Sequence, residues 1–135
     1  MAATFEVEIL TPERTVLKAD VISIVAPGSE GFLGVLAHHA PLITSLMPGP
    51  FTLTYPDERE EVFTISGGFL EVSGNRAIVL ADAAERPGEI DIERAKAAEE
   101  RARNLLKKRP ALLDSDRAEL ALKRAINRIR ASEKY

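Results

Sequence analysis

The spacing of apolar residues changes once along this 135-residue chain, close to Pro87-Gly88. Before that point, short runs alternate apolar and polar residues between Gly and Pro, a pattern typical of strands joined by tight turns. After it, Ala, Leu, Glu, Lys and Arg recur at helical spacing with one interruption. The rigid Pro and the permissive Gly together end the strand pattern. We therefore predict a β domain over residues 1–86 and an α-helical domain over residues 87–135, which we hypothesise to be a mobile arm.

Composition excludes several kinds of protein. The chain has no Cys, so disulfides, thiolate catalysis and cysteine metal sites are excluded. The first ten residues carry no basic stretch, and no apolar run approaches the roughly 20 residues that a membrane-spanning helix needs. We therefore expect no signal peptide, and we expect any association with a membrane to come through a partner.

The β domain is predicted to contain eight to ten short strands. The first, Thr4–Leu10, alternates apolar and polar residues as a half-buried strand does. The others are expected at residues 15–19, 21–25, 33–36, 43–47, 51–55, 61–65, 69–72 and 77–81. Because no helical segment separates these strands, a β-sandwich or a flattened β-barrel follows.

Gly and Pro predict where the strands are interrupted. We expect a loop at Pro27–Gly31, a break between two strands at Pro48–Pro50 and an interrupted ladder at Ser66–Gly68. Ser73–Arg76 is predicted to be a tight turn, and the Gly at its first central position suits type II′.

The β domain shows no arrangement of residues that suits catalysis. Gly28, Gly31 and Gly34 are regularly spaced, but no Lys-Ser or Lys-Thr follows as in a phosphate-binding loop. On a strand, the neighbouring His38 and His39 would point to opposite faces and could not hold one metal ion together. We therefore predict a recognition scaffold, not an enzyme, with no metal and no required cofactor.

The α-helical domain is predicted to be two helices in an antiparallel hairpin. Asp91 suits the N-cap of a first helix over about residues 91–107, which should end before Pro110. Asp116 and Glu119 have the spacing of a capping box for a second helix over about residues 115–132, reached through Ala111–Leu113. The predicted apolar stripes are Ala95, Ala98, Ala102 and Leu105 on the first helix, and Leu122, Ile126 and Ile129, flanked by Ala118, Ala121 and Ala125, on the second.

The estimated free energy of apolar burial suggests that this hairpin is only weakly stable. Its large apolar residues are Leu105, Leu106, Leu120, Leu122, Ile126 and Ile129. Their full burial would contribute about 10–15 kcal/mol gross, and ordering costs would offset most of that. Two hypotheses stay open: a hairpin that never leaves its place, and one that extends onto a partner with higher affinity for the extended form.

Charge is unevenly distributed. Residues 1–88 carry 5 Lys and Arg against 12 Asp and Glu, a net charge of −7, whereas residues 89–135 carry 13 against 9, a net charge of +4. The basic half could meet an acidic partner, but charge alone favours an ordinary solvated helical surface.

Several motifs follow one another along almost the whole chain. They are Gly31–Leu36 with His39–Leu42, Ser66–Val72, Ala83–Arg86, Ile90–Ala95 and Arg117–Ala125. In these motifs the chain resembles the epsilon subunit of bacterial and chloroplast F-type ATP synthases. The resemblance implies a flattened ten-stranded β-barrel followed by two helices, in the central rotor stalk that couples proton flow to ATP synthesis.

The resemblance also implies partners and contact residues. The partners are the gamma subunit, the ring of c subunits, and the alpha and beta subunits of F1, on the cytoplasmic face of the bacterial plasma membrane. Glu30, Gly31 and His39 would contact the stalk or the c-ring. The helices would inhibit ATP hydrolysis when extended, and the residues expected to meet an acidic segment of a beta subunit are Lys123, Arg124, Arg128 and Arg130.

A regulatory ATP site is implied for the helical domain. The motif that binds ATP in some family members stands here as Ile90, Asp91, Arg94 and Ala95, and Glu85 and Arg101 also match contact positions. Arginine forks and a helix start both suit phosphate. Alternatively, Asp91 only caps the helix and Arg94 only pairs with Glu85 or Asp91.

A second function remains open. A free-standing β-sandwich module could use its basic helices to bind nucleic acid, with steep salt dependence. The acidic β half and the lack of aromatic residues among the basic ones argue against it.

Overall fold

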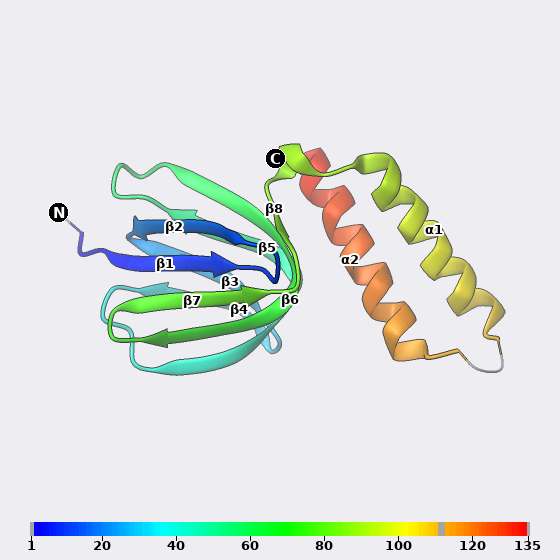
Figure 1. The fold of residues 1–135 in the computed structure, drawn as a ribbon, viewed down its shortest axis with the longest axis horizontal. Coiled ribbons are helices and arrows are strands. Elements are labelled where there is room, and N and C mark those ends of the chain that lie inside the picture. Colours follow the sequence, from blue (N-terminus) through cyan, green and yellow to red (C-terminus); the bar gives the residue numbers. More distant parts are fainter. Residues whose placement is uncertain (1, 111–112, 135) are drawn as a thin grey trace. The chain divides into compact units, whose positions relative to one another are not determined.

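The computed structural model describes residues 2–110 and 113–134 and divides the chain into two units, Met1–Glu85 and Arg86–Tyr135. Figure 1 shows the first as strands and the second as helices. The predicted fold class, an all-β domain followed by an α-helical hairpin, is confirmed. Ala111 and Leu112 of the predicted connection between the helices lie outside the described residues.

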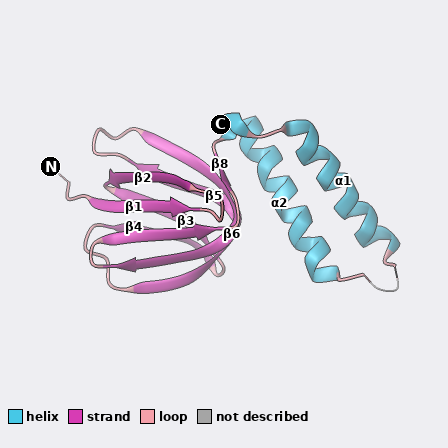
Figure 2. Ribbon diagram, viewed as in Figure 1, coloured by secondary structure: helices cyan, strands magenta, loops and turns pink. Residues whose placement is uncertain are grey.

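The β unit is one hydrogen-bonded sheet folded over into a sandwich (Figure 2). Its described strands are β1 (Phe5–Leu10), β2 (Thr15–Val21), β3 (Ser23–Gly28), β4 (Gly31–Leu36), β5 (Leu42–Thr54), β6 (Glu60–Ser73), β7 (Arg76–Ala81) and β8 (Ala84–Glu85). Their order is β2-β1-β7-β6-β5-β3-β4, with β8 also beside β6. Only β1 and β7 pair in parallel among the described strands.

Strand β5 runs through Pro48–Pro50, where we predicted a break. The ladder with β6 continues there, with Pro48 opposite Ser66 and Pro50 opposite Thr64. Proline has no backbone N–H, so Pro48 and Pro50 cannot donate to a neighbouring strand. Because they are two residues apart, both missing donors lie on the same side of β5. The ladder with β3 is the interrupted one, between Val25 and Gly28. The two prolines therefore lie where the β3–β5 ladder is interrupted, and the β5–β6 ladder stays continuous.

Strand β6 likewise continues through Ser66–Gly68, where we predicted an interrupted ladder. Gly67 and Gly68 have φ values of 105° and 143°, and a Cβ on Gly68 would lie 2.1 Å from the carbonyl oxygen of Leu80. Before this bend β6 pairs with β8, and after it with β7. β5 and β6 each unite two predicted strands, and β8 was not predicted. The sheet has eight described strands, within the eight to ten that the pattern predicted and fewer than the ten that the resemblance implied.

Two turns differ in detail from prediction. The loop expected at Pro27–Gly31 is reduced to Ser29 and Glu30, because β3 extends to Gly28 and β4 begins at Gly31. Ser73–Arg76 is a turn, but Gly74 and Asn75 both have positive φ, 55° and 58°. Positive φ at both central residues defines type I′, so the predicted type II′ is wrong.

Alternating residues of the strands build the core of the β unit. On β1, Phe5, Val7 and Ile9 are buried, as the predicted alternation requires. The largest buried side chains, Phe51 and Phe63, lie directly opposite each other on β5 and β6 and are 0% exposed.

The helical unit contains a 3₁₀ turn, η1 (Pro87–Glu89), and two packed helices, α1 (Ile92–Lys108) and α2 (Ser115–Lys134). Among the described residues, neither helix is long and apolar enough to cross a membrane. The buried residues of the helices are all alanines: Ala95, Ala102, Ala118, Ala125 and Ala131. Leu105, predicted to lie in the α1 stripe, is 44% exposed, whereas its neighbour Leu106 is half-buried.

The helix ends follow local signals, with one correction. Asp91 caps α1 as predicted: its Oδ1 accepts a hydrogen bond from the backbone N–H of Arg94 at 3.1 Å. Helix α1 ends at Lys108, and Arg109 before Pro110 leaves helical geometry. The cap of α2 is Asp114, which accepts from the backbone N–H of Arg117 at 3.1 Å. The predicted cap, Asp116, already lies in the first turn of α2.

Candidate functional site

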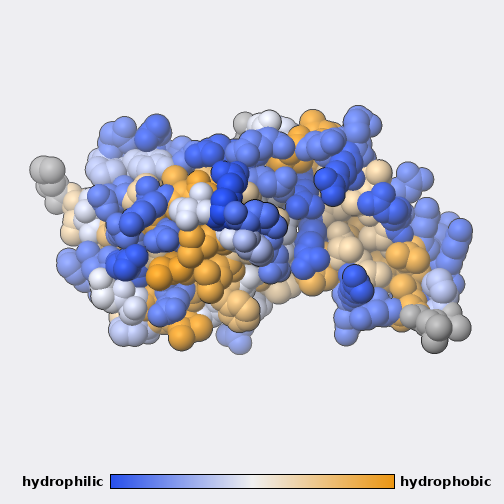
Figure 3. All heavy atoms as spheres, viewed as in Figure 1, coloured by the Kyte–Doolittle hydropathy of each residue, from blue (hydrophilic) through white to orange (hydrophobic). Residues whose placement is uncertain are grey.

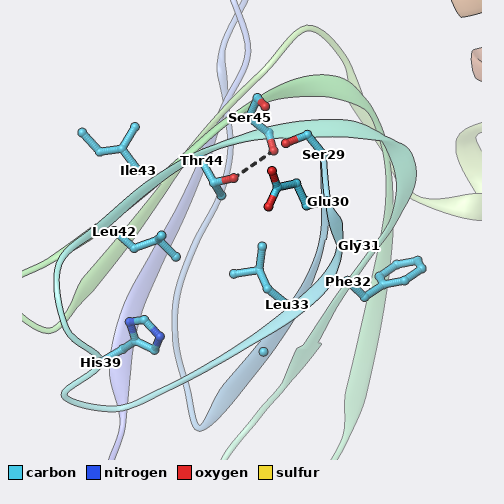
Figure 4. A pocket seen from close by; sticks show the side chains of 12 residues that line it. Ser29, Glu30, Gly31, Phe32, Leu33, His39, Leu42, Ile43, Thr44 and Ser45 are labelled. Carbon is cyan, nitrogen blue, oxygen red and sulfur yellow. Dashed lines mark hydrogen bonds between the residues drawn. The ribbon is translucent and has the colours of Figure 1, made fainter.

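An open pocket in the β unit brings together Glu30, Gly31 and His39, the three residues expected to contact the stalk or the c-ring. It has a volume of about 680 Å³ and lies between the β3–β4 turn, the segment after β4 and the start of β5. Figure 4 shows Glu30 near one end and His39 near the other, with the side chains of Leu33 and Leu42 between them. The pocket therefore offers an apolar middle between two polar ends.

The two-residue turn between β3 and β4 shapes this pocket. Gly31 has a φ of 124°, a conformation that L side chains rarely adopt. A Cβ on Gly28 would lie 2.7 Å from Cδ2 of Leu33 and 2.8 Å from the carbonyl oxygen of Gly31. The two glycines therefore make the turn tight enough for Leu33 to line the pocket beside Glu30.

His38 and His39 lie in a turn between β4 and β5 and not on a strand. Our argument that they point to opposite faces of a strand therefore does not apply. His38 has a φ of 63°. Nδ1 of His39 lies 2.6 Å from the carbonyl oxygen of Ala40. Because a carbonyl oxygen can only accept, Nδ1 is the donor in this contact. Among the described residues, no group of three or more acidic or His side chains is placed to hold a metal ion.

The outer face of the β unit also carries exposed apolar side chains. Phe69 and Leu80 are paired across β6 and β7 and are 58% and 54% exposed, and Ile43 on β5 is 74% exposed. Figure 3 shows hydrophobic residues gathered over β1 and β7 among hydrophilic ones. Large exposed apolar residues at neighbouring positions are typical of a protein-binding surface.

The residues predicted to bind ATP are divided between the units. Ile90, Asp91, Arg94, Ala95 and Arg101 lie at and after the start of α1, and Glu85 ends β8. Ile90 and Ala95 are buried, so neither presents a polar group to a ligand. Arg94 and Arg101 are exposed, two turns apart on one face of α1, and form no ion pair with any residue that the structure describes. Within the helical unit, the alternative ion pair between Arg94 and Asp91 is therefore not present.

The start of α1 is repeated at the start of α2, a signal that sequence reasoning missed. Both helices carry the pattern Asp-x-x-Arg-Ala-x-x-Ala-x-x-Arg-Ala, over residues 91–102 and 114–125. Both Asp residues cap their helix at 3.1 Å, and the first and last Ala of each copy are buried. Capping and helix packing therefore explain Asp91 and Ala95 without a ligand, which leaves Arg94 and Arg101 as the polar groups that face solvent.

The four basic residues predicted to contact a beta subunit do not form one exposed face. Lys123 and Arg130 are exposed and lie seven residues apart, on one side of α2. Arg124 and Arg128 are half-buried.

Comparison with known proteins identifies the family. Residues 4–87 match the beta-sandwich domain of the ATP synthase delta/epsilon chain, and residues 89–133 match its long alpha-helix domain. The chain therefore belongs to the ATP synthase delta/epsilon chain family, which confirms the resemblance seen in its motifs.

Relatives narrow the class to the epsilon chains. The ATP synthase epsilon chain of Moorella thermoacetica is 51% identical over 107 residues, 79% of this chain and 80% of the relative. That of Desulforamulus reducens is 47% identical over 133 residues, 98% of this chain and 100% of the relative. A chain in the OSCP/F1/c-ring structure of Euglena gracilis mitochondrial ATP synthase superposes with a TM-score of 0.81 at 26% identity, covering 94% of this chain and 80% of that one. These similarities support the epsilon-chain interpretation and not the nucleic-acid alternative.

Proposed function

We propose that this protein is the epsilon subunit of a proton-transporting F-type ATP synthase and works without catalytic residues of its own. It belongs to the central stalk, with the gamma subunit, the c-ring and the alpha and beta subunits as partners. It is peripheral to the membrane, on the cytoplasmic face of the bacterial plasma membrane. The observation that carries the proposal is the 47% identity to an epsilon chain over 98% of this chain, through both units in the same order.

The β unit supplies the docking surfaces in this proposal. The pocket of Glu30, Gly31 and His39 faces the c-ring, and the exposed apolar residues Phe69 and Leu80 face the gamma subunit. Reconstituting the complex with and without the chain tests this role. Proton-driven ATP synthesis should need the chain, and equal synthesis in both preparations would contradict the proposal.

We propose further that α2 inhibits ATP hydrolysis when it leaves the hairpin. The helix carries Lys123 and Arg130 on an exposed side, and extension adds Arg124 and Arg128 to a basic surface suited to an acidic partner. The test replaces Lys123 and Arg130 together by Glu in the assembled complex, and hydrolysis should rise severalfold. The matched control replaces Lys96 and Lys107, two exposed cations of α1, by Glu. Equal hydrolysis by both variants would overturn the inhibitory role of α2.

We propose that ATP binds to the hairpin through Arg94 and Arg101. Both guanidinium groups are exposed on one face, and Arg94 lies at the positive end of the α1 dipole, where phosphate is favoured. Asp91, Ile90 and Ala95 shape this helix start, and Glu85 is the remaining candidate contact. Saturation at about 100 times Kd would add about 2.7 kcal/mol to the unfolding free energy.

The repeated helix start provides the control for this site. Arg94→Ala and Arg117→Ala remove the same side chain from the same position of two equally capped helices. ATP should raise the thermal midpoint of the wild type and of Arg117→Ala, but not that of Arg94→Ala. Equal ATP-induced shifts in both variants would rule out Arg94 as a ligand.

A further inference from the structure

The side chain of Asn75 joins three parts of the β unit that are far apart in sequence. Its Oδ1 accepts a hydrogen bond from the backbone N–H of His38 at 2.8 Å. Its Nδ2 donates to the carbonyl oxygen of Thr4 at 3.0 Å. Because an N–H can only donate and a carbonyl can only accept, the two partners fix the orientation of the amide. Asn75 thus connects the β6–β7 turn to the residues before β1 and to the segment between β4 and β5.

The backbone conformation of the turn explains why Asn can do this. Gly74 and Asn75 both have positive φ, as a type I′ turn requires. Asn tolerates this conformation better than most residues, and its short amide stays close to the backbone. The conformation aims the side chain of Asn75 away from the hairpin, toward the two neighbouring segments.

The segment that Asn75 holds, residues 37–41, carries His39 of the pocket. His39 donates from its backbone N–H to the carbonyl of Leu36, the last residue of β4, and Nδ1 of its ring bonds to the carbonyl of Ala40. Both are local contacts. In the part of the chain that the structure describes, the bond from His38 to Asn75 is the one hydrogen bond that ties the segment to a residue beyond β4. His38 also has a left-handed backbone, which persists where surrounding contacts enforce it.

We propose that Asn75 is a positioning residue: it holds residues 37–41 in place, sets where His39 stands at the end of the pocket, and thereby sets how tightly the β unit docks on the c-ring. The last step rests on the proposed function. Asn75 lies outside the set of residues that line the pocket, so it acts through the segment and not by contact with the partner.

Two substitutions separate the hydrogen bonds from the turn. Asn75→Gly keeps the left-handed backbone and removes both bonds. Asn75→Asp keeps an oxygen that can accept from His38 but loses the donor to Thr4. The matched control is Glu58→Gly, which changes another non-glycine residue with positive φ, 67°, in the turn between β5 and β6, where the side chain is exposed.

Amide hydrogen exchange in the full-length protein tests the positioning step without any partner. In Asn75→Gly, exchange of the His38 amide should accelerate about tenfold or more, while the amides of β6 and β7 keep their wild-type rates. Asn75→Asp and Glu58→Gly should leave the His38 rate near that of the wild type. An unchanged His38 rate in Asn75→Gly, or equal acceleration in Asn75→Asp, would overturn the assignment.

Affinity for purified c-ring, measured with the full chain bound to gamma, tests the docking step. Asn75→Gly should bind about threefold or more weakly than Glu58→Gly, mainly through faster dissociation. A mobile His38 amide with unchanged affinity would refute the role of Asn75 in docking. Glu30→Gln with His39→Ala reports on the pocket itself: unchanged affinity in that double variant would contradict the c-ring contact, whatever Asn75 does.

Discussion

The β unit and the helical unit bury apolar surface in different ways. In the β unit, Phe51, Phe63 and Leu53 are 0% exposed and lie on β5 and β6, two strands paired along most of their length. In the helices, the buried residues are alanines, whereas Leu122, Ile126 and Ile129 are only half-buried. Each buried alanine removes little apolar area from water, so the 10–15 kcal/mol expected for full burial of the large residues is an upper bound. The difference suggests a rigid sandwich and a pair of helices that separate at low cost.

The largest effect should come from removing a large side chain from the β core. Phe63→Ala should lower the free energy of unfolding by about 3–5 kcal/mol, since it leaves a cavity in a fully buried site. Leu122→Ala, at a half-buried position of α2, should cost about 1–2 kcal/mol because its site is already in contact with water. Urea unfolding followed by amide signals of each unit measures both. Similar costs for the two would remove the contrast between the units.

Adding a methyl group at the bend of β6 should lower the stability of the protein by a smaller amount. Gly68→Ala should destabilise the protein by at least about 2 kcal/mol, because the added Cβ meets the carbonyl oxygen of Leu80 at a positive φ. The control is Gly88→Ala in η1, where an added Cβ has no atom within 4 Å. That change should stay within about 0.5 kcal/mol or stabilise slightly. If thermal unfolding finds equal losses, the close approach at Gly68 is not what holds the bend.

The smallest loss of stability should come from removing either of the two helix caps. Asp91→Ala and Asp114→Ala should each cost about 1 kcal/mol, since both side chains accept a hydrogen bond at 3.1 Å from the third residue of their helix. Circular dichroism during thermal unfolding provides the measurement, without nucleotide. A much larger loss in Asp91→Ala would show that Asp91 does more than cap α1.

Local signals in the sequence predicted the parts of this fold that depend on short stretches of backbone. The alternation of Phe5, Val7 and Ile9, the cap at Asp91 and the end of α1 before Pro110 all depend on residues within one strand or one helical turn. The choice of Asp116 over Asp114 failed because two acidic residues two apart both suit a helix start. Only the hydrogen bond to Arg117 distinguishes them.

By itself, the sequence determined the class of fold and, through its motifs, the family, because period two, helical spacing and turn residues are properties of neighbouring positions. Only the tertiary structure decided that Pro48–Pro50 continues a strand, that Leu105 faces water, that Glu30 and His39 share a pocket and that Asn75 holds the segment beside them. The physical reason is that each of these depends on which distant strand or helix supplies the neighbour. Such neighbours come from another strand or turn, as far as 37 positions away for His38 and Asn75, and local preferences do not say which one.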